Sequence, residues 1–377
     1  ITSSGSSGSI QVSGSRSFST GANYTYDGAA SQVTGSGLPA TVNNLTVDNA
    51  AGVTLTSSVT ISGTLTLGNG ILDAGANNVA VTNNAMSSVS GSSASFVNLT
   101  TGYLQRVIPG SLSGTGNNYS FPIGQGGTYK AINLSDVTTG ATGPALRATV
   151  SPTGAVTPDG ITVNLIRPGY WSLTNTNSGD FTGAAIELFE TGLTTASVVC
   201  AAPAASGTYS ALGGVPEGSS IKTSFVTSPG QYFAIGELDY TVFYSYKSGD
   251  WNDPTTWTSD PSGTLQIGNE IPHDGVSVVI LTDRTVTLGS DISQTGLNIT
   301  INTGAFLDLA TRRFTATLTS LDGQGTLRLA SVNFPAVTTN TLVNAGGGSV
   351  EYYNSSDFRS EESRVGKESR CGWMRYQ

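Results

Sequence analysis

Charged residues are scarce in this chain of 377 residues: Asp, Glu, Lys and Arg together make up 11% of it, against roughly a quarter of an ordinary soluble domain. Histidine occurs once, as His273, and cysteine twice, as Cys200 and Cys371. This scarcity argues against most metal and nucleophilic chemistry, which depends on His, Cys and paired carboxylates. With two cysteines, the chain also has no disulfide framework of the kind that stabilises small secreted domains.

Charge and hydropathy exclude further classes of partner. The formal net charge is -9 and the isoelectric point is about 4.5, whereas nucleic-acid binding needs clustered Lys and Arg. Mean hydropathy is near zero, and no apolar run has the length of a membrane-spanning helix. The sequence therefore predicts neither a nucleic-acid partner nor a transmembrane segment. It also predicts no cofactor, no metal and no catalytic residue.

Glycine is abundant, with 48 residues, and it separates short stretches in which apolar and polar residues alternate. Between residues 40 and 101 these stretches include Leu45 to Val47, Val53 to Leu55 and Leu65 to Leu67. Alternation with period two puts one side of each strand inward, and Gly and Asn suit the tight corners between strands. Short strands at close intervals without helices favour the coils of a parallel β-helix.

The pattern changes twice more along the chain. From residue 104 to 238, Pro and aromatic residues enter and the strands are longer, which predicts an antiparallel β-sandwich with Trp171 and Phe233 in its core. From 239 to 356 the alternating stretches return after an aromatic-rich first turn in which Trp251 and Trp257 are candidate caps of the open end. The predicted fold is all-β: parallel β-helix (β-solenoid) units, at 1–103 with its Ser/Gly-rich start and at 239–356, flank the sandwich at 104–238.

The last 21 residues differ abruptly in composition. Residues 357–377 contain five basic and four acidic residues, and the run from Arg359 to Arg370 resembles a translated sequencing-adapter or vector sequence. We expect this tail to be non-native and exclude it from the predicted fold. The start at Ile1, without a leader, is expected of an internal fragment of a longer protein.

Three stretches resemble modules of large surface proteins of Bacteroidota that are exported by the type IX secretion system, often called gliding-motility-adhesin-like. The first is Asn43 to Leu55 with Ser62 to Leu67. The second combines Arg106, Tyr119 to Gly124, Arg167 to Leu173 and Gly230 to Glu237. The third, Ser248 to Leu288, also resembles the start of a G8-type domain. The resemblance implies an adhesive scaffold that lies outside the cell or on the outer-membrane surface of a Gram-negative bacterium, as a passive segment that binds weakly at many points.

A few residues are candidates for chemistry. Trp251, Trp257, Tyr244 and Tyr246 are candidate contacts for sugar rings, although packing in the core or as a cap explains the tryptophans better. Asp250, Asn252, Asp253 and Asp260 are candidate calcium ligands, but side-chain caps of a turn ahead of Pro254 explain them more simply. His273 is expected in an exposed loop, and Arg312 with Arg313 near Asp308 is the one mixed charge cluster in the sequence before the tail.

The predicted function is a non-enzymatic, adhesive segment whose partners are extracellular glycans or surface proteins. One alternative is a glycan-binding module of a secreted polysaccharide-degrading protein, for which we expect exposed Trp251 and Trp257. The other is a β-helix polysaccharide lyase or hydrolase, for which we expect two carboxylates facing one groove.

Overall fold

The computed structural model describes residues 18–154, 156–160, 163, 165–238 and 240–353; the tail at 357–377 and Cys371 lie outside this part of the chain. Within it, every regular element is a β-strand except two short 3₁₀ turns, η1 (Met86–Ser88) and η2 (Pro254–Thr256). The all-β prediction is therefore confirmed. Among these residues no helix has the length and apolar character needed to cross a bilayer. The chain divides into two compact units, Ile1–Glu237 and Leu238–Gln377.

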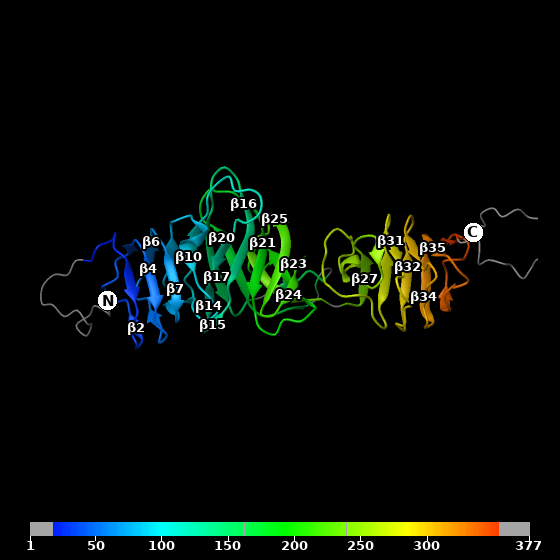
Figure 1. Ribbon diagram of the computed structural model, residues 1–377, viewed down its shortest axis with the longest axis horizontal. Coiled ribbons are helices and arrows are strands. Elements are labelled where there is room, and N and C mark those ends of the chain that lie inside the picture. Colours follow the sequence, from blue (N-terminus) through cyan, green and yellow to red (C-terminus); the bar gives the residue numbers. More distant parts are fainter. Residues whose placement is uncertain (1–17, 155, 161–162, 164, 239, 354–377) are drawn as a thin grey trace, which may run out of the picture. The chain divides into compact units, whose positions relative to one another are not determined.

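The first unit starts as a three-sided solenoid, in which each coil adds one parallel strand to each of three sheets, S1, S2 and S3 (Figure 1). S1 contains β1 (Tyr24–Tyr26), β4 (Leu45–Asp48), β7 (Leu65–Asn69) and β10 (Val89–Ser90). S2 contains β2 (Gln32–Val33), β5 (Val53–Thr54), β8 (Leu72–Gly75) and β11 (Val97–Leu99). S3 contains β3 (Thr41–Val42), β6 (Val59–Ile61), β9 (Val79–Val81) and β12 (Leu104–Val107). The predicted parallel β-helix is confirmed.

Equivalent residues of successive coils stack in columns. In S1 the inward column is Tyr24, Leu45, Leu65 and Val89, and none of these side chains is more than 5% exposed. The residue that directly follows each of these in its strand points outward. Together these residues form an outward column of short hydroxyl side chains, namely Thr25, Thr46, Thr66 and Ser90. Burying a Val or Leu side chain contributes about 1.5–3 kcal/mol, so each coil depends on its neighbours to cover its inward residues.

Glycine and asparagine at the corners let neighbouring coils approach closely, as the sequence predicts. Gly70 has a φ of +78°, and a Cβ atom at this position would lie 1.9 Å from the backbone oxygen of Asn49 in the preceding coil. Asn49 is 1% exposed, and its Nδ2 donates to Gln32 Oε1 at 2.9 Å. The corner therefore excludes any side chain at Gly70 and satisfies the buried amide within the stack.

Strand β12 joins the solenoid to an antiparallel sandwich. It pairs in parallel with β9 on one side and antiparallel with β17 (Ala145–Ser151) on the other. S3 continues through β20 (Tyr170–Asn175), β26 (Tyr232–Glu237), β22 (Ser197–Ala202), β23 (Thr208–Gly213) and β18 (Thr157–Pro158), with β19 (Leu165–Ile166) beside β26. A further sheet, S4, contains β13 (Tyr119–Phe121), β16 (Ile132–Thr139), β21 (Phe181–Phe189), β25 (Ser220–Thr227) and β24 (Val215–Glu217). The predicted sandwich is confirmed, and Trp171 and Phe233 are buried in its core.

The solenoid and the sandwich share one hydrophobic core, which extends from Tyr24 to Ile235. The predicted boundary at 103/104 is therefore a change of strand arrangement inside one unit, and not a break between two domains. The division between Glu237 and Leu238 lies one residue from the other predicted boundary. S2 ends differently from S3, because its last strands are the hairpin of β14 (Ile123–Gln125) and β15 (Thr128–Tyr129).

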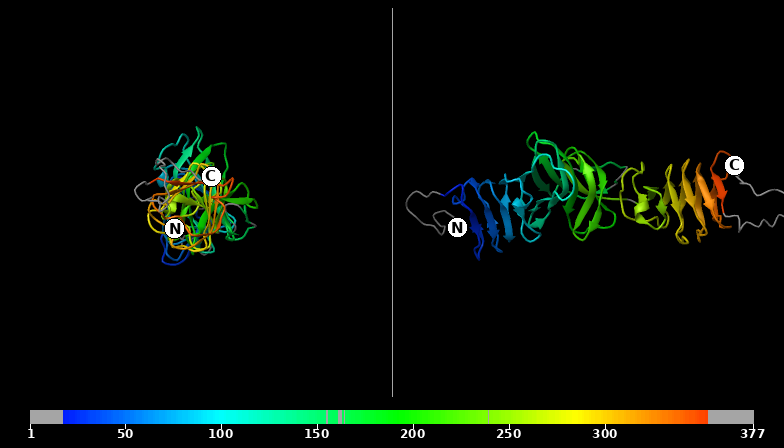
Figure 2. Two further views of the ribbon diagram at one scale, coloured as in Figure 1. Left: turned by 90° about the vertical axis from the view of Figure 1, so that its right-hand side faces the viewer. Right: turned by 45° about the horizontal axis from the view of Figure 1, so that its top comes forward.

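The second unit is a solenoid with two principal sheets, S5 and S6, whose strands stack side by side (Figure 2). S5 contains β29 (Trp257–Thr258), β27 (Val242–Ser245), β30 (Ser277–Ile280), β32 (Asn298–Ile301), β34 (Leu318–Gly323) and β36 (Val337–Asn340). S6 contains β28 (Gly249–Asp250), β31 (Thr285–Thr287), β33 (Phe306–Asp308), β35 (Thr326–Leu329) and β37 (Ser349–Tyr352). All neighbouring strands are parallel except β29, which pairs antiparallel with β27 at the edge of S5.

Candidate functional site

The two candidate tryptophans of the second unit are buried. Trp251 is 0% exposed and Trp257 is 1% exposed, and their ring centroids lie 5.1 Å apart in an edge-to-face contact. Trp257 Nε1 donates to the backbone oxygen of Trp251 at 2.8 Å. The tryptophans therefore pack in the core, as the sequence favours, and the exposed platform that the glycan-binding alternative expects is not formed, because β29 pairs with β27 and η2 precedes Trp257 directly.

Tyr244 and Tyr246 are half-buried and do not complete such a platform. Tyr244 follows Phe243, which is 1% exposed and contacts the Trp257 ring edge-to-face. Because successive residues of a strand face opposite sides of the sheet, Tyr244 lies on the side of S5 away from the tryptophans. Ring contact with a sugar at these two tyrosines stays a prediction.

The acidic residues after Ser248 act as turn caps. Asp250 Oδ1 accepts a hydrogen bond from the backbone N–H of Asn252 at 2.7 Å. Asp253 caps η2 by accepting from the backbone N–H of Thr255 at 2.8 Å, directly before Pro254. Hydrogen bonds from the side chain and backbone of Thr255 hold the pKa of Asp253 below its ordinary value. This is the capping role that the sequence offers as the simpler alternative to calcium binding.

Asp260 has the same role at a more buried position. It is 6% exposed and accepts backbone hydrogen bonds at 2.9 Å from Ser262, Thr264 and Leu265. Burial raises the pKa of its carboxyl, but the hydrogen bond from the Ser262 hydroxyl and these backbone hydrogen bonds together outweigh burial and lower the pKa overall. Among the residues that the structure describes, no three His, Cys, Asp or Glu side chains gather as a metal ion would require.

The remaining charged candidates also make local contacts. His273 is exposed, as expected, and its Nδ1 lies 3.2 Å from the backbone oxygen of the next residue. The expected cluster of Arg312 and Arg313 with Asp308 is not formed: Arg313 pairs with Asp291 at 3.5 Å, and Asp308 pairs with Arg328 at 3.5 Å. The parallel register of β33 and β35 places Asp308 directly beside Arg328.

Arg106, part of the second stretch of the resemblance, is fully buried. It occupies the inward column of S3 after Val42, Ile61 and Val81 and is 0% exposed. Its guanidinium donates to three backbone oxygens, those of Ser120, Ala85 and Met86, and to Ser88 Oγ. Burial lowers the pKa of Arg106 to about 10, so the group remains charged at neutral pH. It therefore connects the last coil to the first strand of S4.

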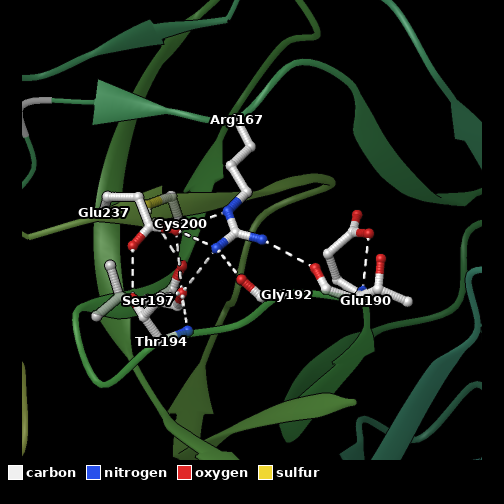
Figure 3. A network of polar contacts seen from close by, with 9 residues as sticks. Arg167, Glu190, Gly192, Thr194, Ser197, Cys200 and Glu237 are labelled. Carbon is white, nitrogen blue, oxygen red and sulfur yellow. Dashed lines mark hydrogen bonds and ion pairs between the residues drawn. The ribbon is translucent and has the colours of Figure 1, made fainter.

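The two other charged residues of that stretch pair with each other. Arg167 Nε donates to Glu237 Oε1 at 2.6 Å, and the rest of the guanidinium donates to the backbone oxygens of Thr191 and Gly192 (Figure 3). Ser197 Oγ also donates to Glu237 at 3.0 Å. The network ties the loop after β21 to β26. Figure 3 also shows the nearby Cys200 thiol, whose pKa burial raises to about 12.

The first unit contains three principal hollows among its described residues. One of about 480 Å³ lies at the end of the sandwich beside Phe181, and one of about 300 Å³ lies on S2 beside Asp73 and Asn98. The third, of about 370 Å³, lies between the β14–β15 hairpin and the loops of the sandwich. We call it the Lys130 cleft. Each hollow is lined by a single carboxylate: Asp180 in the hollow beside Phe181, Asp73 in the hollow on S2, and Glu190 in the Lys130 cleft. The lyase or hydrolase alternative expects two carboxylates facing one groove.

The Lys130 cleft is the one of these hollows that combines a cation, a carboxylate and aromatic rings. Lys130 Nζ forms an ion pair with Glu190, and the two side chains are 22% and 17% exposed. The same Nζ lies 5.8 Å from the centroid of the Trp171 ring, and Trp171 Nε1 donates to the backbone oxygen of Lys130 at 2.8 Å. Tyr170 is half-buried and is also among the lining residues. This arrangement offers donors, acceptors and ring surface to a small polar ligand.

The sequence interpretation missed Lys130 and Glu190. They are 60 residues apart in the chain, and they meet because β16 and β21 pair antiparallel from Ile132 opposite Leu188. The only local feature of the sequence that could have drawn attention to this pair is Lys130 itself, because Lys is rare in this chain. The comparisons found no family model, no curated protein and no solved structure that matches the chain. The resemblance to type IX secretion-associated surface proteins thus stays a prediction.

Proposed function

We propose that this chain is a structural and adhesive segment of a large secreted or cell-surface protein of a Gram-negative bacterium. The observation that carries the proposal is where the residues behind the resemblance lie. Arg106 and Trp171 are buried in the shared core of the first unit, and Arg167 pairs with Glu237. These residues stabilise the fold of the first unit, which supports a scaffold role more than a catalytic one.

The outward faces supply the contacts in this proposal. Strands of a sheet lie about 4.8 Å apart, so Thr25, Thr46, Thr66 and Ser90 form a regular row of hydroxyl groups along S1. A single hydroxyl binds weakly, but many contacts made at once add through effective concentration. The partners are extracellular glycans or surface proteins, and the chain provides an extended segment that makes repeated weak contacts with them.

The test compares the binding of single chains in solution with the binding of many chains on one bead. We expect the purified chain to bind glycan-coated or matrix-coated surfaces weakly in solution, and roughly 10²- to 10⁴-fold more tightly when it is coated densely on beads. Beads coated with an unrelated acidic protein of equal charge control for nonspecific adsorption. Absence of any gain on the beads would contradict the adhesive role. Release of new reducing ends from the same glycans would contradict the non-enzymatic role.

A further inference from the structure

We propose that the Lys130 cleft binds a neutral oligosaccharide. This deepens the proposed adhesive function, since it assigns one ligand class to one site of the first unit. The volume of about 370 Å³ lies within the range of about 300–1,000 Å³ that small-molecule sites occupy. One to a few sugar rings are ligands of this size and polarity.

The polar groups of the cleft match hydroxyl groups better than they match ions. Lys130 donates and Glu190 accepts, while a sugar hydroxyl does both. Because the ammonium and the carboxylate neutralise each other, an anionic ligand would face Glu190 and a cationic ligand would face Lys130. Hydrogen bonds from ionised groups are about twice as strong as those between neutral groups, so a neutral polyol gains from both partners.

The walls of the cleft are held in place before any ligand arrives. Trp171 is 3% exposed and pairs across β20 and β26 with Phe233. Gly169 has a φ of +93°, and a Cβ atom there would lie 2.6 Å from the backbone oxygen of Ser151, so only glycine allows these two walls to approach. Glu190 Oε1 also accepts from the backbone N–H of Thr191 at 2.9 Å. Rigid walls reduce the entropy lost on binding.

Tyr170 supplies the ring surface. It lines the cleft and is fixed by an edge-to-face contact with Tyr232, with 5.8 Å between the ring centroids. Because successive residues of a strand face opposite sides of the sheet, this ring lies on the other face of β20 from Trp171, at the rim of the cleft, where it offers the apolar face of a sugar ring a packing surface. The turn of the β14–β15 hairpin borders both this cleft, through Thr128, and the hollow on S2, through Gly127. Longer oligosaccharides therefore have a second polar surface within reach.

The experiment uses the full chain and a glycan array that carries neutral, sulfated and uronic-acid oligosaccharides. We expect neutral oligosaccharides to bind, and the strongest of them is then titrated by calorimetry. Lys130→Met and Tyr170→Ala are each expected to weaken its binding at least about tenfold, while Lys130→Arg, which keeps the charge, retains most of it. The matched control for Lys130→Met is Lys222→Met, at an exposed position of S4 outside the cleft.

Hydrogen exchange in β20 and β21 confirms that each variant keeps its fold, so a loss of affinity reports the site itself. Binding of anionic glycans alone, absence of any neutral ligand on the array, or equal affinity of Lys130→Met and Lys222→Met would each overturn the proposal. Dense beads that still hold glycan surfaces after Lys130→Met would leave the adhesive function in place and refute this site. Beads that never bind would refute the adhesive function instead.

Discussion

Replacing Arg106 by methionine should destabilise the first unit strongly, although the new side chain is apolar and similar in length. Arg106 sits in a column whose other members are aliphatic, so volume alone would favour the substitution. Its hydrogen bonds argue the other way. Arg106→Met leaves the backbone oxygens of Ala85, Met86 and Ser120 without this donor, and each buried group left unsatisfied costs about 1–3 kcal/mol.

Two further terms set the net effect. The guanidinium also lies over the Tyr119 and Phe121 rings, at 5.1 and 5.9 Å from their centroids, and these cation–π contacts are lost. Against this, methionine removes the cost of burying a charge that makes no ion pair with any described carboxylate. Because this gain offsets part of the lost hydrogen bonding, we expect a net loss of about 2–4 kcal/mol in the free energy of unfolding.

The matched control is Arg147→Met, one strand away. Arg147 lies on the outward side of β17, where it donates to Gln105 Oε1 at 2.8 Å and covers the Tyr103 ring at 4.2 Å. Because water replaces these contacts, the control should lose no more than about 1 kcal/mol. Urea unfolding gives the free energies, and hydrogen exchange in β9, β12 and β13 locates the effect. An Arg106→Met chain as stable as wild type would show that the hydrogen bonds of Arg106 do not stabilise the junction between the solenoid and the sandwich.

Three further predictions concern the buried polar groups. Trp257→Phe removes the hydrogen bond from Nε1 and part of the ring, and urea unfolding of the second unit should show a loss of about 1–3 kcal/mol; a loss confined to the first unit would contradict this. Burial raises the pKa of Tyr26, Tyr129 and Tyr209 to about 12, so the folded chain keeps protons that the unfolded chain releases above pH 10. Stability should be complete below pH 10 and fall toward pH 12, and an absorbance titration in which all tyrosines ionise together near pH 10 without unfolding would argue against it. Asp260→Asn should lower the free energy of unfolding by about 1 kcal/mol at neutral pH. This difference from wild type should shrink as the pH falls through the lowered pKa of the Asp260 carboxyl. A difference in free energy that stays the same at acid pH would count against the capping role.

The sequence predicts the repeating parts of this fold well, because alternation and corner residues are local signals. The stretch from Leu45 to Val47, for example, predicts a strand, and β4 covers Leu45–Asp48. Trp171 and Phe233 are buried as predicted. The shared core of solenoid and sandwich left no such signal, since composition changes at residue 104 whereas β12 pairs on both sides.

The candidate site was predictable only in part. Trp251 and Trp257 stand next to turn residues, so their exposure depends on η2 and on the antiparallel pairing of β29, neither of which alternation encodes. The Lys130 cleft depends on contacts between strands far apart in the sequence. Lys130 reaches Glu190 only through the register of β16 with β21, and register over such separations is set by the whole core.

The position of the cleft follows from the way in which the first unit changes fold. A three-sided solenoid that turns into a two-sheet sandwich cannot continue all of its sheets, and here S1 ends at β10 while S2 ends beside the sandwich. S3 continues into the sandwich through β12 and β17, and S2 ends at the β14–β15 hairpin. The hairpin satisfies the exposed edge of S2, as sheets require, and a step is left beside it. Lys130 follows β15 directly, so the chain places one of its few lysines where S2 ends beside the sandwich, and a ligand site there needs no departure from the packing that stabilises the rest.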